Sequence, residues 1–251
     1  MSTIFDLTGK VAIVTGANTG IGQAIALSLA AAGADIAAVG RTPAEETVEK
    51  VRALGRKAEI VSADLSSIEP VQRVVDETIA KLGGLDTLIN NAGIIRRADS
   101  VDFTEEDWDA VIDTNLKSTF FLAQAAGRHM LAQGSGKIVN IASLLSFQGG
   151  IRVPSYTASK SGVAGLTKLL ANEWAAKGVN VNAIAPGYIA TNNTAALQAD
   201  ETRNRQIQER IPAGRWGDPS DIGGAAVFLS SPAANYIHGH VLAVDGGWLA
   251  R

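Results

Sequence analysis

The stretch Lys10-Val-Ala-Ile-Val-Thr15-Gly16-Ala-Asn-Thr-Gly20-Ile-Gly22 decides the fold of this chain. A short apolar, β-branched run leads directly into a glycine-rich turn, and a helical segment follows the turn. Glycine lets the backbone turn tightly and approach a phosphate, while the N-terminus of the next helix offers free N–H groups and a favourable dipole. A nucleotide-binding turn requires this order of strand, turn and helix. The stretch therefore predicts a nucleotide site near the start of the chain.

Outward from this stretch, short apolar runs alternate with longer helical segments. Such alternation indicates right-handed crossovers, and continuously apolar strands are typical of a parallel sheet covered on both faces. We expect one α/β domain over residues 1–251, with a Rossmann-type, doubly wound parallel sheet of about seven strands and helices on both faces. The expected strands are Val11–Thr15, Ile36–Val39, Ala58–Ala63, Thr87–Asn90, Lys137–Ile141, Val179–Ala185 and Val241–Val244. The expected helices are Gln23–Ala32, Ala44–Leu54, Pro70–Leu82, Glu105–Ala132, Gly162–Lys177 and Ser220–Ser230.

Composition narrows the range of partners. The chain has 251 residues, 46% of them hydrophobic, which is ample for a large core. Its net charge of −3 argues against a nucleic-acid partner. The absence of Cys and the presence of only three His argue against disulfides and a metal site. No segment approaches the ~18 consecutive apolar residues of a membrane helix, and the N-terminal stretch does not resemble a secretory signal. We expect a cytoplasmic protein with no membrane partner.

A second stretch, Ser155-Tyr-Thr-Ala-Ser-Lys160, contains a candidate acid/base pair. On a helix, Tyr156 and Lys160 are four residues apart and share a face. A phenol loses its proton near pH ~10, and a nearby ammonium lowers that pKa because it favours the phenolate. The pair could therefore exchange a proton near neutral pH.

The end of the second expected strand bears on the choice of nucleotide. An acid there would bond the ribose hydroxyls, but the residues are Gly40-Arg41-Thr42. Arg41 could pair with a 2′-phosphate, which favours NADP, or it could lie against the adenine or in solvent. Asp64 and Leu65, after the third strand, could bind the adenine amine, although Asp64 could instead cap a helix.

Further motifs follow at the strand ends in a consistent order. They are Asn90-Asn91-Ala92-Gly93, Ile141-Ala142-Ser143 and Pro186-Gly187. Together with the glycine turn, Asn115 and the Tyr156/Lys160 pair, these motifs make the chain similar to the short-chain dehydrogenase/reductase family over nearly its whole length. The resemblance implies hydride transfer between a nicotinamide and a secondary alcohol or its ketone.

The resemblance also implies a role for each matching residue. Tyr156 would exchange the proton, Lys160 would bind the nicotinamide ribose and lower the pKa of Tyr156, and Ser143 would hold the substrate oxygen. Asn115 would help to hold a water that links Lys160 to solvent. Ser143 could instead cap a strand end, and Asn115 could simply bond backbone in mid-helix. The other residues implied to contact the cofactor are Gly16, Asn18, Thr19, Gly20, Ile21, Asn91, Ala92, Gly93, Pro186, Gly187, Ile189 and Thr191.

The polar excursion Ala190–Gly217 falls between a strand and a helix, and we expect it to be a substrate lid. The lid and the loops after Ser143 and Gly93 are rich in Arg and amide side chains, which suit a polyhydroxylated carboxylate better than an acyl chain or a steroid. The runs Gly187–Gly217 and Gly93–Arg97 resemble the sugar-acid branch of the family. The expected substrate contacts are Ser143, Leu145, Gln148, Arg152, Tyr156 and Asn193.

The resemblance implies an intermediate of bacterial pectin breakdown as substrate and, usually, NAD as cofactor. Arg41 favours NADP(H) instead, so we expect NAD(H) from the resemblance and leave NADP(H) open. A homotetramer is also implied, with residues 105–132 and 162–177 at one interface and 241–251 at the other. Gluconate and a 3-oxoacyl chain on a carrier protein stay open as alternative substrates. A non-catalytic nucleotide-binding regulator is the alternative from another class, but such proteins typically lose the Tyr or the Lys.

Overall fold

The strands form one parallel sheet in the computed structural model, which describes residues 3–251. The order is β3-β2-β1-β4-β5-β6-β7, and the direction of winding reverses between β1 and β4. A ligand cleft is expected at the carboxyl ends of the strands at such a reversal. The strands are β1 (Val11–Thr15), β2 (Asp35–Gly40), β3 (Ala58–Ser62), β4 (Thr87–Asn90), β5 (Gly136–Ile141), β6 (Val179–Pro186) and β7 (Val241–Val244). The predicted fold class is confirmed; the first two residues of the predicted domain lie outside the described part.

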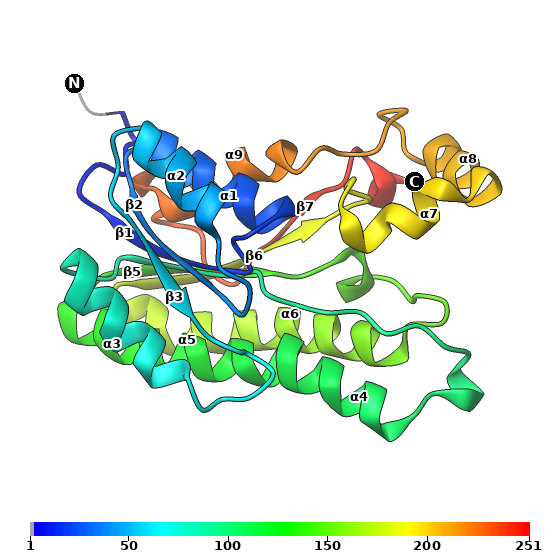
Figure 1. Ribbon diagram of the computed structural model, residues 1–251, viewed down its shortest axis with the longest axis horizontal. Coiled ribbons are helices and arrows are strands. Elements are labelled where there is room, and N and C mark those ends of the chain that lie inside the picture. The colour runs from blue at the N-terminus through cyan, green and yellow to red at the C-terminus, as the bar shows by residue number, and fades with distance from the viewer. Residues whose placement is uncertain (1–2) are drawn as a thin grey trace.

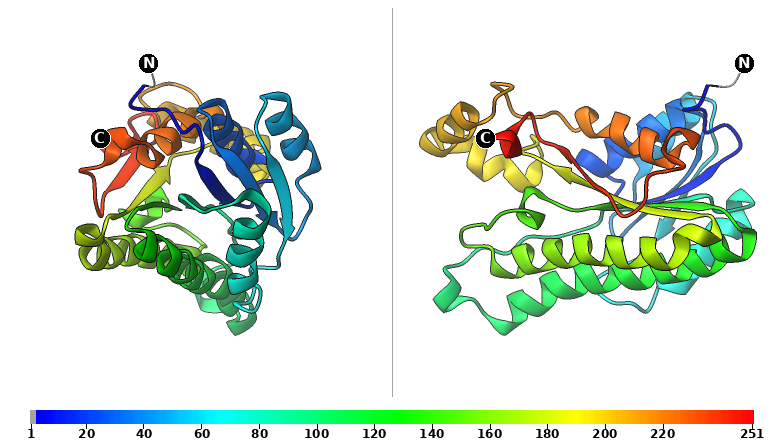
Figure 2. Two further views of the ribbon diagram at one scale, coloured as in Figure 1. Left: turned by 90° about the vertical axis from the view of Figure 1, so that its left-hand side faces the viewer. Right: turned by 180° about the vertical axis from the view of Figure 1, so that it is seen from behind.

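Helices cover both faces of the sheet, as Figures 1 and 2 show. Each helical layer packs its apolar residues onto one face, so the core consists mainly of two clusters separated by the sheet. One layer contains α1 (Gly20–Ala31), α2 (Glu45–Ala53) and α9 (Ser220–Ser230), and the other contains α3 (Val71–Leu82), α5 (Ser118–Gln133) and α6 (Pro154–Trp174).

Two helices differ from the sequence prediction in ways that affect the site. Helix α6 begins at Pro154, before the expected start at Gly162, because proline is well suited to the first turn of a helix. Tyr156 and Lys160 therefore lie on the same helix. The single helix expected over 105–132 is instead α4 (Glu105–Ile112), a π-helical turn (Asp113–Lys117) and α5. The π-helical turn contains Asn115, and such turns are frequent at functional sites.

The expected lid is largely helical. It contains α7 (Ala195–Ala199) and α8 (Glu201–Arg210), which lie together at one end of the molecule in Figure 1. Its two ends meet, because the Gly217 N–H donates to the Tyr188 carbonyl over 2.9 Å and the Ala190 N–H donates to the Gly217 carbonyl over 2.8 Å. The excursion is thus tied at its base. Within residues 3–251, no helix has the length and apolarity needed to cross a bilayer.

Candidate active site

The glycine turn connects β1 to α1 and leaves the start of that helix open. Gly16 and Gly20 have φ of +64° and +56°, which other residues rarely adopt. A Cβ at Gly22 would collide with the Gly16 carbonyl oxygen. Thr19, at the N-cap of α1, makes no side-chain capping hydrogen bond. The first N–H groups of α1, with the positive end of the helix dipole, therefore suit an anionic ligand.

The end of β4 braces this turn. The Asn91 side-chain amide donates to the Thr15 carbonyl over 2.8 Å, and the Thr15 hydroxyl accepts from the N–H groups of Asn91 and Ala92 over 2.9 Å each. These bonds join the loop after β4 to the end of β1. They therefore help to fix the shape of the turn.

A cleft of about 260 Å³ runs from the glycine turn to the start of α6. Most of the residues predicted to contact the cofactor line it: Gly16, Asn18, Thr19, Gly20, Ile21, Asn91, Ala92, Gly93, Tyr156, Lys160 and Thr191. Gly22 of the predicted glycine turn also lines it, as do Ile141 and Asn192, which were not predicted to contact the cofactor. The structure thus brings segments from both halves of the sheet to one cleft.

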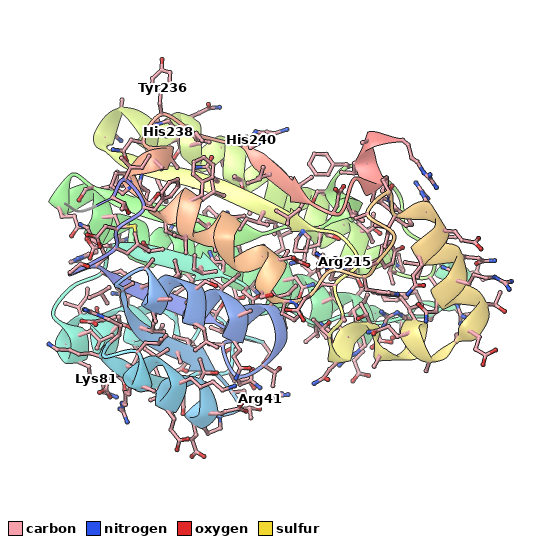
Figure 3. The ribbon with its side chains drawn as sticks, turned by 90° about the horizontal axis from the view of Figure 1, so that it is seen from above. Arg41, Lys81, Arg215, Tyr236, His238 and His240 are labelled. Carbon is pink, nitrogen blue, oxygen red and sulfur yellow. The ribbon has the colours of Figure 1, made fainter. Side chains whose placement is uncertain are left out.

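Six of the predicted cofactor residues lie outside the lining of this cleft: Arg41, Asp64, Leu65, Pro186, Gly187 and Ile189. Arg41 lies at the surface next to β2 (Figure 3), with its guanidinium 3.9 Å from the Asp64 carboxylate. The Asp64 carboxylate also accepts from the Ser66 N–H, and hydrogen bonds to Ser66 are the main reason its pKa is lowered. Asp64 does not cap α3, because that helix begins only at Val71.

Lys160 is buried at the floor of the cleft. Its Nζ donates to the Ile141 carbonyl over 2.6 Å and lies 5.6 Å from the centre of the Tyr156 ring. Burial lowers the pKa of Lys160 to about 8, because the charged form loses its hydration. The partner of this lysine is a main-chain oxygen, which no sequence pattern reveals.

Tyr156 differs from the expectation drawn from its spacing to Lys160. Burial raises the pKa of Tyr156, and a hydrogen bond with Ser143 and the positive charge of Arg97 offset this rise only in part. The pKa of Tyr156 is therefore raised and not lowered as expected. The desolvation of the phenolate outweighs the stabilisation that its polar neighbours provide.

Asn115 bonds backbone, as its alternative interpretation proposed. Its carbonyl oxygen accepts from the Ile94 N–H over 2.8 Å, and its amide donates to the Ile94 carbonyl over 2.9 Å. The amide also lies 3.4 Å from the Ser159 hydroxyl. Asn115 thus ties the loop after β4 to the helical layer that carries Tyr156.

The loop after Ser143 contains several of the predicted substrate contacts. The Ser143 hydroxyl accepts from the Leu145 N–H over 3.2 Å, and the Gln148 side-chain oxygen accepts from the Trp248 indole over 3.2 Å. Arg152 forms an ion pair with Asp99 over 3.0 Å. None of these residues lines the cleft, whereas Tyr156 and Asn193 do.

Trp248 belongs to the segment 241–251 that was expected at a subunit interface, and it was not among the predicted site residues. It is buried against the lid, with the Arg210 guanidinium 4.0 Å from its ring and the Tyr188 ring 4.6 Å away. The apolar tail therefore folds back on its own domain. The apolar composition of the tail was the only signal that could have indicated it.

Comparisons with known proteins agree with this geometry. A family model described as enoyl-(acyl carrier protein) reductase matches residues 16–249. The 2-dehydro-3-deoxy-D-gluconate 5-dehydrogenase of Escherichia coli is 59% identical over 248 residues, which are 98% of each chain.

Two solved structures are similar over almost the whole chain. The first, from Agrobacterium tumefaciens, is provisionally named a 2-deoxy-D-gluconate 3-dehydrogenase and holds NADP; it is 62% identical with a TM-score of 0.93 and covers 99% of this chain and 100% of its own. The second, from Beutenbergia cavernae, is provisionally named an NAD(P)-dependent gluconate 5-dehydrogenase and also holds NADP. It is 52% identical with a TM-score of 0.96 and the same coverage.

Proposed function

The chain belongs to the short-chain dehydrogenase/reductase family of oxidoreductases, and from this premise we propose that it interconverts a secondary alcohol and a ketone on a sugar acid with NAD(P)(H). The most specific form of the proposal is a 2-dehydro-3-deoxy-D-gluconate 5-dehydrogenase, also called 2-deoxy-D-gluconate 3-dehydrogenase. The observation that carries the proposal is the continuous cleft from the glycine turn to Tyr156 and Lys160. The relatives of 59% and 62% identity support the choice of substrate.

The cleft fits a nicotinamide dinucleotide. The uncapped start of α1 and the Gly22 position, which has no room for a Cβ, suit a pyrophosphate. Gly93, Lys160 and Thr191 line the route toward Tyr156 and would contact the nicotinamide half. A bound nicotinamide would supply the chemistry of hydride exchange with the substrate carbon.

The protein's own residues handle the proton and the substrate oxygen. Tyr156 accepts the hydroxyl proton during oxidation and returns it during reduction. Ser143, whose side chain lowers the pKa of Tyr156, stabilises the negative charge that develops on the same oxygen.

Lys160 and Asn115 complete the proposed machinery. Lys160 is fixed by the Ile141 carbonyl, and near pH 7 its amine is mainly charged because its pKa is about 8. We assign it to the nicotinamide ribose and to stabilising the Tyr156 phenolate once the cofactor is present. For Asn115 we keep the proposal of a water relay to solvent, in addition to its bond with Ile94.

Both nicotinamide cofactors are part of the proposal. Family resemblance favours NAD(H), but Arg41 has 80% of its side chain exposed and only a distant carboxylate at 3.9 Å, so it is free to approach a 2′-phosphate. The two NADP-bound relatives support acceptance of NADP(H) as well.

We further propose a cytoplasmic homotetramer that acts in pectin degradation. The exposed Trp108 of α4 and Leu169 of α6 suit one subunit interface. Tyr236 is 99% exposed and stands out from the molecule in Figure 3, close in sequence to the edge strand β7, which suits the second interface. The excursion 190–217 keeps its proposed role as substrate lid within one domain.

The direct test is nicotinamide absorbance with sugar acids and acyl thioesters, using both cofactors. We expect turnover of 2-dehydro-3-deoxy-D-gluconate or its 2-deoxy-D-gluconate counterpart to exceed turnover of gluconate, and no turnover of the thioesters. Tyr156→Phe should abolish turnover and leave nucleotide affinity nearly unchanged. Turnover by that variant would refute the assignment of Tyr156.

Gluconate is the second candidate substrate, because a structural relative named for gluconate is 52% identical. A higher kcat/KM for gluconate in the same panel would make it the preferred substrate. A 3-oxoacyl chain is less well suited, because the segments around the cleft carry Arg96, Arg97 and Arg152 and the cleft itself is lined by Asn192 and Asn193.

A further inference from the structure

Arg97 lies in the loop after β4, at the mouth of the cleft. Asn115 fixes this loop at Ile94 through two hydrogen bonds of 2.8 and 2.9 Å. Farther along the loop, the Arg97 guanidinium donates to the Asn193 carbonyl over 3.2 Å, and Asn193 lines the cleft from the lid side. Arg97 therefore spans the entrance between a fixed loop and the lid.

Three arginines near this entrance already have an acidic partner, whereas Arg97 has none in the part of the chain that the structure describes. Arg96 pairs with Asp107 over 3.0 Å, Arg152 pairs with Asp99 over 3.0 Å, and Arg215 pairs with Asp221 over 2.7 Å. Arg210 stacks on the Trp248 ring. In contrast, no carboxylate between residues 3 and 251 forms an ion pair with Arg97.

Arg97 also acts electrostatically on the reacting group. Its positive charge favours the Tyr156 phenolate and so lowers the pKa of Tyr156. A substrate whose hydroxyl meets Tyr156 and Ser143 would thus extend toward a guanidinium with unused donors. Guanidinium is the side-chain group best suited to a carboxylate, because it offers two parallel N–H donors.

We infer that Arg97 binds the carboxylate of the substrate and so selects acids over neutral polyols. This inference rests on the proposed sugar-acid function, and it identifies the residue that recognises the substrate carboxylate. The hydrogen bond to the Asn193 carbonyl holds the guanidinium at the entrance until the substrate arrives. Asn193 would then lie beside the bound carboxylate, as its predicted role requires.

The test compares Arg97→Gln with Arg96→Gln, a matched control at the neighbouring position whose arginine already has an acidic partner. Each variant is assayed with the preferred sugar acid and with its C1 amide, which has the same shape without the charge. We expect Arg97→Gln to lower kcat/KM for the acid roughly 10- to 100-fold, mainly through KM, and to change the value for the amide less than about 3-fold. Arg96→Gln should change neither by more than about 3-fold.

A binding measurement gives an independent readout. Titration of the hydroxy acid tartrate into the enzyme with bound NADPH should show weaker binding for Arg97→Gln, and Arg97→Lys should restore part of it because the charge returns without the planar fork. Equal losses of kcat/KM on acid and amide would mean that Arg97 only holds the lid. Loss of the preference for the acid in Arg96→Gln or Arg152→Gln would mean that one of those arginines binds the carboxylate. Either result overturns the inference. Failure of the wild-type enzyme on every sugar acid would instead refute the proposed function.

Discussion

Replacement of Lys160 with Met should abolish turnover and stabilise the ligand-free protein. Lys160 is 5% exposed, and burial lowers its pKa from 10.5 to about 8. At about 1.4 kcal/mol for each pH unit, this difference makes the charged lysine destabilising by ~3 kcal/mol at pH 7. Loss of its hydrogen bond to the Ile141 carbonyl removes about 1 kcal/mol of stability. The net expectation is a gain of ~2 kcal/mol in the free energy of unfolding.

The pH dependence of this gain separates the charge effect from packing. Because the folded-state pKa lies below the unfolded-state value, the unfolded chain binds more protons between about pH 8 and 10.5. The stability of the wild-type protein therefore rises with pH in this window, and that of the variant lacks this contribution. The advantage of Lys160→Met should shrink by ~2 kcal/mol between pH 7 and pH 9.5.

The assay is urea unfolding at fixed protein concentration, at several pH values and without nucleotide. Lys168→Met is the control, because Lys168 is an exposed lysine on the same helix. It should change stability by less than about 0.5 kcal/mol at every pH. If Lys160→Met is less stable than the wild type at pH 7, or if its advantage does not vary with pH, the buried charge is not the dominant effect and the reasoning is wrong.

Four further predictions follow from the site. Gly22→Ala should weaken nucleotide binding at least ~10-fold and destabilise by ~1–3 kcal/mol, as measured by titration and thermal unfolding, because its Cβ has no room; Gly224→Ala, on open helix surface, should be neutral or stabilising. Arg41→Ala should lower kcat/KM for NADPH roughly 10- to 100-fold and leave NADH nearly unchanged, and an equal loss with both would contradict its pairing with a 2′-phosphate. Trp248→Phe keeps an aromatic ring but loses the indole N–H that donates to Gln148. KM for the sugar acid should therefore rise roughly 2- to 10-fold with kcat and nucleotide affinity unchanged. Arg97→Gln should move the rising limb of the pH profile of oxidation to higher pH, by less than ~0.5 pH unit, because loss of the positive charge raises the pKa of Tyr156; an unshifted profile would place Arg97 out of electrostatic range.

Several features of the site are local in sequence, and they could be predicted for that reason. The strand, glycine turn and helix of residues 10–22 form from neighbouring residues, so their order along the chain indicates the fold and the anion-binding helix start. The spacing of Tyr156 and Lys160 sets their shared helix face in the same way. The positions of the seven strands agree closely with the apolar runs, because both faces of a parallel sheet are buried.

The balance of charges and the burial around the site depended on contacts between distant segments. Arg96 and Arg97 are adjacent and alike in sequence, yet only the folded chain places Asp107 against the first and leaves the second without an acidic partner. Likewise, the pairing of Tyr156 and Lys160 suggested a lowered phenol pKa, but desolvation of the Tyr156 phenolate reversed the direction. The fold, the glycine turn and the shared helix face of Tyr156 and Lys160 could be predicted from the sequence, because each depends on short-range spacing. The ion pairs of the arginines and the pKa values of Tyr156 and Lys160 could not, because desolvation and ion pairing depend on the whole surrounding structure.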